Sequence, residues 1–368
     1  MRLGIVLHDF ALGGTERIAV RLAEAWAKAG ADVEIFCGCS DGPIKSMIAP
    51  EIRVAEATPP IPRGIGSLRR LAKAAARHFG SQDIQAVFVP GNFHWPVIAE
   101  LAKISPNRRP TIVAQISSAL HKQERGGLRQ QYFEARSRRR LARADAVVAL
   151  SDQTAREAQM ILRRPVETIR LPVLPDKPQA PSPVPEGQPM VVAAGRFVHQ
   201  KDFPTLVEAF AKIRHPTATL AIIGDGPQYR RVASRARALG LEQRVSLPGY
   251  VPDIRPWLDR CRLFVLSSRH EGYGAVIVEA LAAGRPVVTT DCTPASLELL
   301  RDETIGMTVP ISNPAALACA LDIMLNRPAP DPAEIARNVD PWRIGPIAAE
   351  YLDLFRRPCS KASSMRLP

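Results

Sequence analysis

The stretch of residues 268–290 constrains the fold of this chain most, because it encodes a strand end, a tight loop, a short helix and a second strand in direct succession. Its sequence is SRHEGYGAVIVEALAAGRPVVTT. The apolar run RLFVLSS that leads into it is typical of a buried parallel strand. Gly272 and Gly274 then turn the chain, and Gly284 ends a helix of under about three turns. A unit of this kind predicts a parallel sheet that is covered by helices.

The same alternation of apolar strands and helical segments runs through most of the chain and predicts an α/β fold. The other predicted strands are residues 3–8, 33–36, 86–90, 111–117, 146–150, 190–194, 220–224, 245–247 and 306–309. From residue 172 to residue 189, seven of eighteen residues are proline, which excludes a helix or a central strand. A chain of 368 residues is long enough for two domains, and this proline-rich segment is the predicted linker.

Two glutamates flank the glycines of the 268–290 stretch and indicate the kind of ligand. Gly272 and Gly274 let the backbone approach a ligand at a helix N-terminus, where free N–H groups and the helix dipole favour a phosphate. Glu271 would repel a phosphate unless it faces hydroxyl groups, and Glu279 can accept hydrogen bonds from a diol. A nucleotide-sugar has phosphates in its middle and hydroxyl groups at both ends, so it fits. The alternative is a loop and a helix with two solvated glutamates.

Two other loops have features of a phosphate site. Arg196 and Lys201 follow the strand at residues 190–194; an arginine can bind a diphosphate with two hydrogen bonds, and a lysine can supply a point charge. Two solvated cations are the alternative. Gly13 and Gly14 open the first predicted helix, and a glycine pair at that place can bind a phosphate. The alternative is a tight turn, which would need glycines as well. The GxGxxG pattern and a ribose-binding acid after the second strand are missing, so a dinucleotide-binding Rossmann domain is disfavoured.

Positive charge is concentrated in the first half of the chain. Residues 1–180 hold 27 Lys and Arg against 17 Asp and Glu, a net charge of +10, whereas residues 181–368 hold 22 against 19, a net charge of +3. One face of the helix predicted over residues 67–79 carries Arg69, Arg70, Lys73 and Arg77. An anionic acceptor or an anionic membrane surface would account for this excess, and a solvated helix face is the alternative. Nucleic acid has less support because the basic stretches lack interleaved aromatic residues.

The hydropathy and the cysteines bear on location. No run approaches the roughly 18 apolar residues of a membrane span, and a strand begins directly after Met1, so we expect neither an anchor nor a signal peptide. The six cysteines lack metal-site spacing apart from one Cys-Gly-Cys, which favours free thiols in a reducing compartment. We therefore expect a cytoplasmic protein, with peripheral attachment to the inner face of the membrane left open.

The glutamates and glycines of the 268–290 stretch resemble the donor signature of the retaining GT-B glycosyltransferases of family 4. The resemblance extends over most of the chain, through five landmarks in the expected order from Gly13 to Glu279. It implies that Glu271 contacts sugar hydroxyls, that the backbone of residues 272–275 holds the diphosphate, and that Glu279 holds the ribose. It also implies that the backbone of the first loop reaches the donor phosphate across a cleft.

The resemblance also implies which residues bind the donor and which act in catalysis. The donor-binding residues would be Gly13, Gly14, Arg196, Lys201, Gly224, Tyr250, Val251, Glu271, Gly272, Tyr273, Gly274, Ala275 and Glu279. Arg196, Lys201 and Glu271 are the expected catalytic residues. The two cations would stabilise the departing phosphate, and Glu271 would hold the sugar without acting as a nucleophile.

The acceptor side departs from the family pattern. Many relatives carry a histidine in the loop after the strand at residues 111–117, whereas this loop reads Gln-Ile-Ser-Ser, so that histidine is absent or displaced to His121. His94 and His121 follow the carboxyl ends of predicted strands, where open α/β sheets bind ligands. Asp9, after the first strand, is the third acceptor-side candidate.

The family resemblance predicts a GT-B fold, with two doubly wound Rossmann-like domains, a cleft between them and a C-terminal helix that crosses back. The expected segments are an acceptor-binding domain (1–172), a nucleotide-sugar-binding domain (173–340), the returning helix (341–357) and a disordered tail (358–368). The expected activity is transfer of a hexose from a UDP- or GDP-linked donor to a saccharide or lipid-linked acceptor, with retention and without a metal or cofactor, in bacterial surface polysaccharide or glycolipid synthesis. A nucleotide-sugar epimerase of the same architecture and a non-catalytic anion-binding protein are the alternatives.

Overall fold

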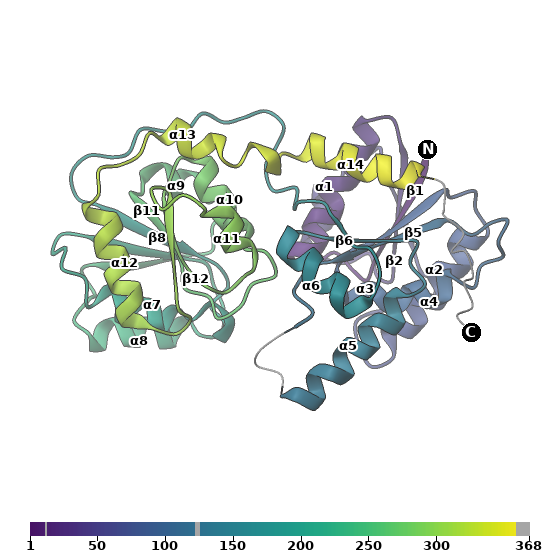
Figure 1. The fold of residues 1–368 in the computed structure, drawn as a ribbon, viewed down its shortest axis with the longest axis horizontal. Coiled ribbons are helices and arrows are strands. Elements are labelled where there is room, and N and C mark those ends of the chain that lie inside the picture. Colours follow the sequence, from purple (N-terminus) through teal and green to yellow (C-terminus); the bar gives the residue numbers. More distant parts are fainter. Residues whose placement is uncertain (12, 122–125, 358–368) are drawn as a thin grey trace. The chain divides into compact units, whose positions relative to one another are not determined.

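Two parallel β-sheets form the framework of the chain (Figure 1). The computed structural model describes residues 1–11, 13–121 and 126–357. The chain divides into two compact units: unit 1 comprises Met1–Pro172 and the segment that begins at Ile344, and unit 2 comprises Val173–Arg343. The tail predicted over residues 358–368 lies outside the described residues. Both sheets alternate with helices, which confirms the predicted α/β class.

Unit 1 contains a seven-stranded parallel sheet in the order β3-β2-β1-β4-β5-β6-β7. Its strands are β1 (Arg2–Leu7), β2 (Asp32–Cys37), β3 (Arg53–Glu56), β4 (Ala86–Val89), β5 (Thr111–Ile116), β6 (Ala146–Ala149) and β7 (Glu167–Thr168). The central strands are apolar throughout because helices cover both faces of the sheet. The sequence did not predict β3 and β7. Both are edge strands that pair on one side only, so they need few buried apolar residues.

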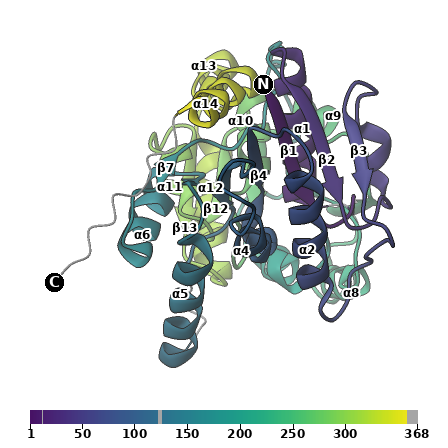
Figure 2. The same cartoon turned by 90° about the vertical axis from the view of Figure 1, so that its right-hand side faces the viewer.

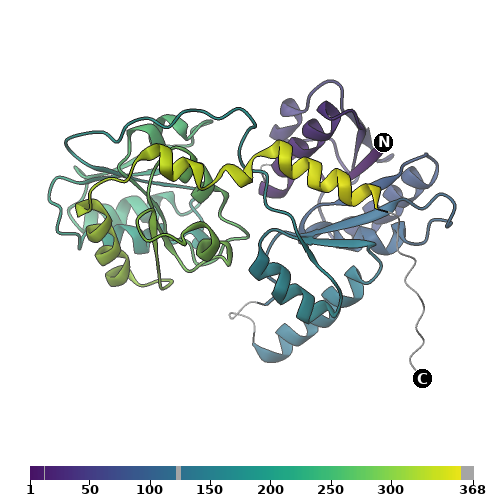
Figure 3. The ribbon, with the colours of Figure 1, turned by 45° about the horizontal axis from the view of Figure 1, so that its top comes forward.

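Helices α1 (Gly14–Lys28) and α14 (Ile344–Arg356) contact each other in unit 1 (Figure 3). Trp26 of α1 packs edge-on against Phe88, Tyr351 and Phe355, and its Nε1 donates a hydrogen bond to the Ala348 carbonyl at 3.1 Å. The returning helix was predicted from residue 341, but it begins at Ile344. The preceding turn, η4 (Asp340–Trp342), belongs to unit 2, because the Trp342 carbonyl accepts hydrogen bonds from the first residues of the linker.

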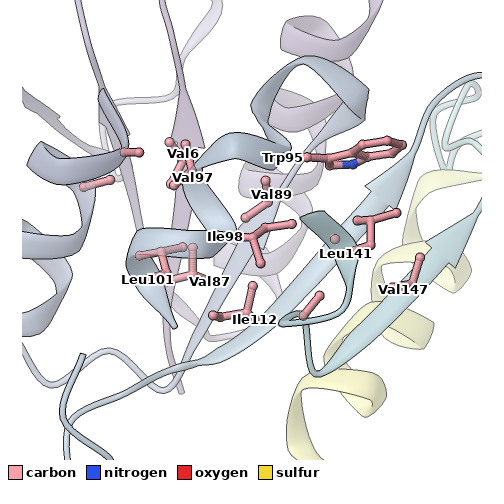
Figure 4. Close-up of a cluster of buried hydrophobic side chains, with 14 of the residues drawn as sticks. Val6, Val87, Val89, Trp95, Val97, Ile98, Leu101, Ile112, Leu141 and Val147 are labelled. Atoms are coloured by element: carbon pink, nitrogen blue, oxygen red, sulfur yellow. The ribbon is translucent and has the colours of Figure 1, made fainter. Parts of the chain in front are cut away.

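The remaining helices of unit 1 enclose its main apolar core. They are α2 (Ser67–Gly80), α3 (Gly91–His94), η2 (Trp95–Val97), α4 (Ile98–Leu101), α5 (Gly127–Leu141) and α6 (Asp152–Leu162), and the 3-10 turn η1 (Pro43–Met47) precedes β3. Figure 4 shows the centre of this core, where Trp95, Ile98 and Leu141 meet side chains of the sheet.

Unit 2 contains a six-stranded parallel sheet in the order β10-β9-β8-β11-β12-β13. Its strands are β8 (Met190–Ala194), β9 (Thr219–Ile223), β10 (Val245–Gly249), β11 (Leu263–Leu266), β12 (Val287–Thr290) and β13 (Gly306–Val309). Its helices are η3 (His199–Lys201), α7 (Phe203–Phe210), α8 (Tyr229–Ala238), α9 (Arg255–Arg260), α10 (Ala275–Ala282), α11 (Ala295–Leu299), α12 (Pro314–Asn326) and α13 (Pro332–Arg337). Helices α7, α8 and α12 share one apolar core with the sheet.

Each sheet has a point where the strand order reverses. In unit 1, β1 lies between β2 and β4; in unit 2, β8 lies between β9 and β11. Chain segments leave such a point toward opposite faces of the sheet, and ligands of open α/β sheets bind beyond the carboxyl ends of the strands there. The loops concerned are residues 8–13 and 90–94 in unit 1, and residues 195–202 and 267–274 in unit 2. The predicted site residues are concentrated in these four loops.

Candidate active site

The loop after β8 carries Lys201 back across the end of its own strand. A Cβ atom at Gly195 would lie 2.7 Å from Cε of Lys201, so only glycine leaves room for this side chain. Gly224 follows β9 with a φ of +134°, and a Cβ there would lie 2.0 Å from the Gly195 carbonyl oxygen. The structure therefore places Gly224, a predicted donor-binding residue, directly against the backbone that supports Lys201.

Hydrogen bonds join the Lys201 loop to the loop after β11. The Arg269 amide donates to the Gln200 carbonyl at 2.7 Å, and Nε2 of Gln200 donates to the His270 carbonyl at 2.8 Å. The Ser267 hydroxyl donates to the carbonyl of Lys201 at 2.9 Å. The two loops thus form one connected structure at the strand-order reversal of unit 2.

The predicted catalytic residues Lys201 and Glu271 form an ion pair within this structure. Nζ of Lys201 lies 2.6 Å from Oε1 of Glu271, and the Ser268 hydroxyl donates to the same oxygen at 2.5 Å. The side chains are 16% and 12% exposed, so the pair is largely shielded from water. Removing one partner would leave a poorly solvated charge.

Arg196, the other predicted cation, has a different environment. Its side chain is exposed, and the guanidinium makes no hydrogen bond or ion pair with any residue that the structure describes. A nearby cation, Arg269, is instead held by the buried carboxylate of Asp202, whose Oδ2 lies 3.0 Å from Nε of Arg269. Arg196 is therefore the guanidinium of this region that has its hydrogen-bond donors available for an anion.

Helix α10 begins directly after the Glu271 loop. Its N-cap is Gly274, with a left-handed φ of +81°, and no side chain caps its first amides. Ala275, Val276 and Glu279 are half-buried, whereas the residues on the opposite side of the helix are buried. Glu279 therefore lies one turn beyond Ala275 on the same accessible face. This face combines free amides and a carboxylate, as the prediction for a phosphate and a ribose requires.

The side chain of Tyr273 is buried and is not accessible to a ligand. It is only 5% exposed, and its hydroxyl accepts a hydrogen bond from Nε1 of Trp342. Its side chain fixes the loop to η4, which leaves only its backbone for the predicted contact with a diphosphate. At the end of β10, in contrast, Tyr250 is 63% exposed and Val251 is half-buried. The side chain of Tyr250 is therefore accessible to a ligand.

In unit 1, Asp9 belongs to a charged cluster at the end of β1. The Arg63 guanidinium donates to both oxygens of Asp9, with Nη2 2.8 Å from Oδ1, and the same Nη2 lies 2.9 Å from Oε1 of Glu16. Burial raises the pKa of Asp9, but the hydrogen bonds from Arg63 and from the Ala11 amide, together with the positive charge of Arg63, outweigh burial and hold the pKa below its usual value. Arg63 also stacks on Phe93, 4.9 Å from the ring centre. Asp9 is thus an ionised, positioned carboxylate.

His8 lies fully buried beside this cluster. Its Nδ1 is 3.5 Å from Oδ2 of Asp9, too far for a hydrogen bond, and neither ring nitrogen has a partner among the described residues. Burial lowers its pKa, so the ring is neutral at pH 7.

His94 does not fit its predicted place on the acceptor side. It is fully buried, its Nδ1 donates to the Pro90 carbonyl at 2.7 Å, and its Nε2 accepts from the His8 amide at 3.1 Å. Burial lowers its pKa to about 4, so it is neutral, and both nitrogens are used by the backbone. His94 joins the ends of β1 and β4, and it has no surface to offer a ligand.

His121 and the glycine pair have more open positions. The His121 side chain is 55% exposed and lies 3.4 Å from a carboxylate oxygen of Glu134. Gly13 caps α1, where a Cβ would lie 2.0 Å from Oε2 of Glu16, whereas no described atom lies within 4 Å of a Cβ at Gly14. The start of α1 therefore already has a carboxylate beside it, neutralised by Arg63, and Gly14 faces free space.

Several residues of these clusters were not predicted from the sequence. Ser268 and Gln200 lie within predicted loops, but nothing in their spacing shows that they join Lys201 to Glu271. Arg63 lies 54 residues from Asp9 along the chain, and no local pattern connects the two. His8 ends an apolar strand, and its burial depends on the packing of β4.

The cysteines, the possible metal ligands and the length of the helices bear on redox chemistry, metal binding and membrane insertion. Cys37, Cys39, Cys261, Cys292 and Cys319 are free, as predicted, and burial raises the pKa of the Cys292 thiol, next to the Glu271 loop, to about 11. In the described part of the chain, no three His, Cys, Asp or Glu side chains are grouped so that they can hold a metal ion. Within those same ranges, no helix has the length and apolar character needed to span a bilayer.

Two family models match the chain, one in each unit. The model described as Glycosyl transferases group 1 matches residues 188–327, and the model described as Glycosyl transferase 4-like domain matches residues 13–175. The first range contains the Lys201–Glu271 pair and α10, and the second contains α1 and most of the sheet of unit 1.

Curated relatives agree with these matches. The chain is 38% identical over 138 residues to the lipopolysaccharide core biosynthesis glycosyltransferase LpsE of Rhizobium meliloti, a match that covers 38% of this chain and 40% of the relative. For LpsD of the same organism, the identity is 28% over 218 residues, and the match covers 57% of this chain and 63% of the relative. The matches thus span about half the length of these curated relatives.

Similarity of structure extends along nearly the whole chain. Anabaena Alr3699/HepE in complex with UDP aligns with a TM-score of 0.77 at 18% sequence identity, over 96% of this chain and 99% of that one. At this identity the similarity concerns the fold alone. The two family models, which between them match residues 13–175 and 188–327, show that the chain belongs to the glycosyltransferases of group 1, and the two parallel sheets and this alignment show that its fold is GT-B.

Proposed function

We propose that this chain transfers a hexose from a UDP- or GDP-linked donor to a saccharide or lipid-linked acceptor, with retention of the anomeric configuration, in the synthesis of a bacterial surface polysaccharide or glycolipid. The names of LpsE and LpsD, both lipopolysaccharide core biosynthesis glycosyltransferases, support a glycolipid acceptor. UDP in a structure of the same fold supports a UDP-linked donor.

The ion pair between Lys201 and Glu271 carries this proposal. It lies at the strand-order reversal of unit 2, beside the exposed Arg196 and the uncapped start of α10. A donor diphosphate would attract Lys201 away from Glu271, and the carboxylate released would accept hydrogen bonds from sugar hydroxyls. The ion pair thus supplies a cation to the phosphate and an anionic hydrogen-bond acceptor to the sugar hydroxyls.

The remaining donor contacts follow from the same geometry. The amides of residues 272–275 would bind phosphate oxygens, as free amides at a helix N-terminus do. Glu279 would accept from the ribose hydroxyls, and Tyr250 and Val251 would lie against the base. We also propose that the free backbone at Gly14 binds a phosphate oxygen.

The chemical step needs charge stabilisation on the leaving group. When the bond between the anomeric carbon and the phosphate oxygen breaks, its electron pair stays on the phosphate, beside Arg196, Lys201 and the α10 amides. The acceptor oxygen then bonds to the anomeric carbon on the same face, and its proton passes to the departing phosphate. Glu271 positions the sugar, and no residue of the chain becomes covalently attached to it.

Acceptor binding is proposed for unit 1. Asp9 is the strongest candidate, because its ionised carboxylate is positioned by Arg63 and can accept from an acceptor hydroxyl. His121 stays a candidate because its side chain is exposed. The buried His94 is not proposed again as an acceptor contact.

The test is incubation of the purified chain with UDP- and GDP-hexoses and a panel of saccharide and lipid-linked acceptors. Transfer to an added acceptor supports the proposal, and the anomeric coupling constant of the product in an NMR spectrum reports retention or inversion. An epimerised sugar nucleotide without transfer would indicate the epimerase instead. Nucleotide binding without turnover of any donor would indicate a binding protein.

We further propose a cytoplasmic location with contact to an anionic membrane surface through unit 1. Helix α2 supports this, because Arg69, Arg70, Lys73 and Arg77 are all exposed along one stripe. The protein would then meet lipid-linked acceptors at the membrane in which they are embedded.

A further inference from the structure

One side of helix α5 combines large apolar side chains with arginines, all of them exposed. We call this set the α5 stripe; its members are Leu128, Arg129, Tyr132, Arg136 and Arg139 of the helix, and Arg143, two residues beyond its end. Leu128 is 84% exposed and Tyr132 is 68% exposed, and the two lie about one helical turn apart on the same side as the arginines.

Helical geometry places these side chains together. At 3.6 residues per turn, the five positions of the stripe within the helix fall within an arc of about 100° on its surface. The opposite side, with Gln130, Ser137 and Leu141, is buried against unit 1. Figures 1 and 2 show that the labelled helix α5 extends away from the rest of unit 1 at its N-terminal end, where the two apolar side chains lie.

The folded chain itself does not account for this arrangement. None of the four arginines of the stripe has a carboxylate partner among the described residues. Arg136 and Arg139 are three positions apart, a spacing at which like charges on a helix repel each other. Leu128 and Tyr132 are meanwhile exposed to water, so within the described part of the chain both components of the stripe lack a partner that would stabilise them.

We propose that the α5 stripe docks on the surface of an anionic lipid bilayer. Leu128 and Tyr132 would enter the boundary between head groups and acyl chains, and the four arginines would bind lipid phosphates. Nucleic acid could satisfy the arginines, but its backbone offers nothing to the leucine. A bilayer surface offers lipid phosphates to the arginines and an apolar layer to Leu128 and Tyr132, both within reach of one helix.

The inference refines the membrane contact proposed above for unit 1, and it does not depend on the sugar chemistry. Helix α2 exposes four cations along its length, and the nearest exposed large apolar side chain, Ile65, lies two residues before the helix begins. On α5, two large apolar side chains and three arginines share one side of the same helix. This combination makes the α5 stripe the primary attachment.

The test is co-sedimentation of the full chain with vesicles of equal parts phosphatidylglycerol and phosphatidylcholine, and with pure phosphatidylcholine vesicles, at physiological ionic strength. One variant changes Leu128 and Tyr132 to Ser; a second changes Arg129, Arg136, Arg139 and Arg143 to Gln. The matched control changes Arg69, Arg70, Lys73 and Arg77 of α2 to Gln, which removes the same charge from the same unit.

The stripe predicts unequal effects from these variants. The parent should sediment with anionic vesicles and not with neutral ones. The Leu128/Tyr132 variant should lose about tenfold in partition coefficient, as expected when two apolar side chains can no longer insert. The arginine variant of α5 should lose about a hundredfold or more, and clearly more than the α2 variant.

Three outcomes would overturn the inference. They are an unchanged partition coefficient for the Leu128/Tyr132 variant, a loss for the α2 variant equal to that for the α5 arginine variant, and tighter binding of the parent to a single-stranded RNA than to anionic vesicles. Because all exchanged side chains are exposed, circular dichroism and thermal unfolding should match the parent. Sugar transfer to a water-soluble acceptor should persist in every variant, so a failure of the stripe is distinguishable from a failure of the proposed function.

Discussion

Lys201 offers the sharpest test of the proposed chemistry. If it stabilises the charge that builds up on the departing phosphate, Lys201→Ala should lower the maximal rate by roughly 10²–10³, the loss typical of one preorganised electrostatic donor. Donor affinity should fall much less, because Arg196 and the amides of α10 still bind the phosphates. The assay is steady-state transfer over a range of donor concentrations, which separates the maximal rate from the Michaelis constant.

The ion pair adds a second effect that must be separated from the first. Without Lys201, the Glu271 carboxylate keeps only the 2.5 Å hydrogen bond from Ser268 in a site where its side chain is 12% exposed. Breaking a fully buried pair costs about 3–5 kcal/mol. The remaining exposure and the Ser268 bond reduce this, so we expect a loss of about 2 kcal/mol in the free energy of unfolding, measured in urea.

A double variant distinguishes the two effects. In Lys201→Ala/Glu271→Gln, the unpaired charge is gone, so most of the lost stability should return. The maximal rate should stay low, because neither the cation nor the sugar-binding carboxylate is restored. Exposed Lys212 in the same unit supplies a matched control, whose change to Ala should alter stability by less than about 0.5 kcal/mol and leave turnover unchanged.

The reasoning would be refuted by either of two results. Recovery of turnover in the double variant would mean that Lys201 acts only by neutralising Glu271. Near-parental turnover of folded Lys201→Ala at saturating donor would remove this loop from the active site.

Three other predictions test the proposed ribose contact of Glu279 and the buried hydrogen bonds of His94 and Tyr351. Glu279→Gln should weaken nucleotide binding by about 1.5–3 kcal/mol in calorimetry; an unchanged affinity would remove Glu279 from the ribose. Because burial lowers the pKa of His94 from 6.5 to about 4, the unfolded chain takes up this proton first as the pH falls. The parent should therefore lose stability in urea between pH 6.5 and about 4, and His94→Gln should lose less; equal losses would contradict the assignment. Tyr351→Phe should cost about 1–3 kcal/mol, because the buried Gln115 amide that donates to the Tyr351 hydroxyl at 2.9 Å loses its acceptor, and an unchanged urea midpoint would contradict this.

Much of the fold could be predicted because local signals agree with the final packing. The strands at residues 190–194 and 306–309 have the predicted bounds, since short apolar runs between turn residues have few other stable environments. Asn313 caps α12, where its side chain accepts a hydrogen bond from the Ala316 amide at 3.0 Å, and Gly284 takes the left-handed φ of +73° that ends α10. The edge strands β3 and β7 were missed because one-sided pairing leaves little apolar pattern to detect.

The site was predictable to the extent that its residues follow strand ends. Lys201 and Glu271 lie 70 residues apart, yet both were predicted, because each belongs to its own strand-loop-helix unit. That they bind each other depends on β8 and β11 being neighbours in the sheet, which neither unit specifies. For the same reason, the contact of Arg63 with Asp9 and Glu16 was not predicted.

The sequence by itself determined the alternating strands and helices, the glycines that the tight loops require, and the side chains that lie at the strand ends. These depend on backbone geometry and burial over a few residues. Only the tertiary structure decided which of those side chains stay accessible: it leaves the Arg196 guanidinium without a partner among the described residues, pairs Lys201 with Glu271 and buries His94 between the ends of β1 and β4. The physical reason is that burial and ion pairing depend on strand order, which brings together residues that are distant along the chain.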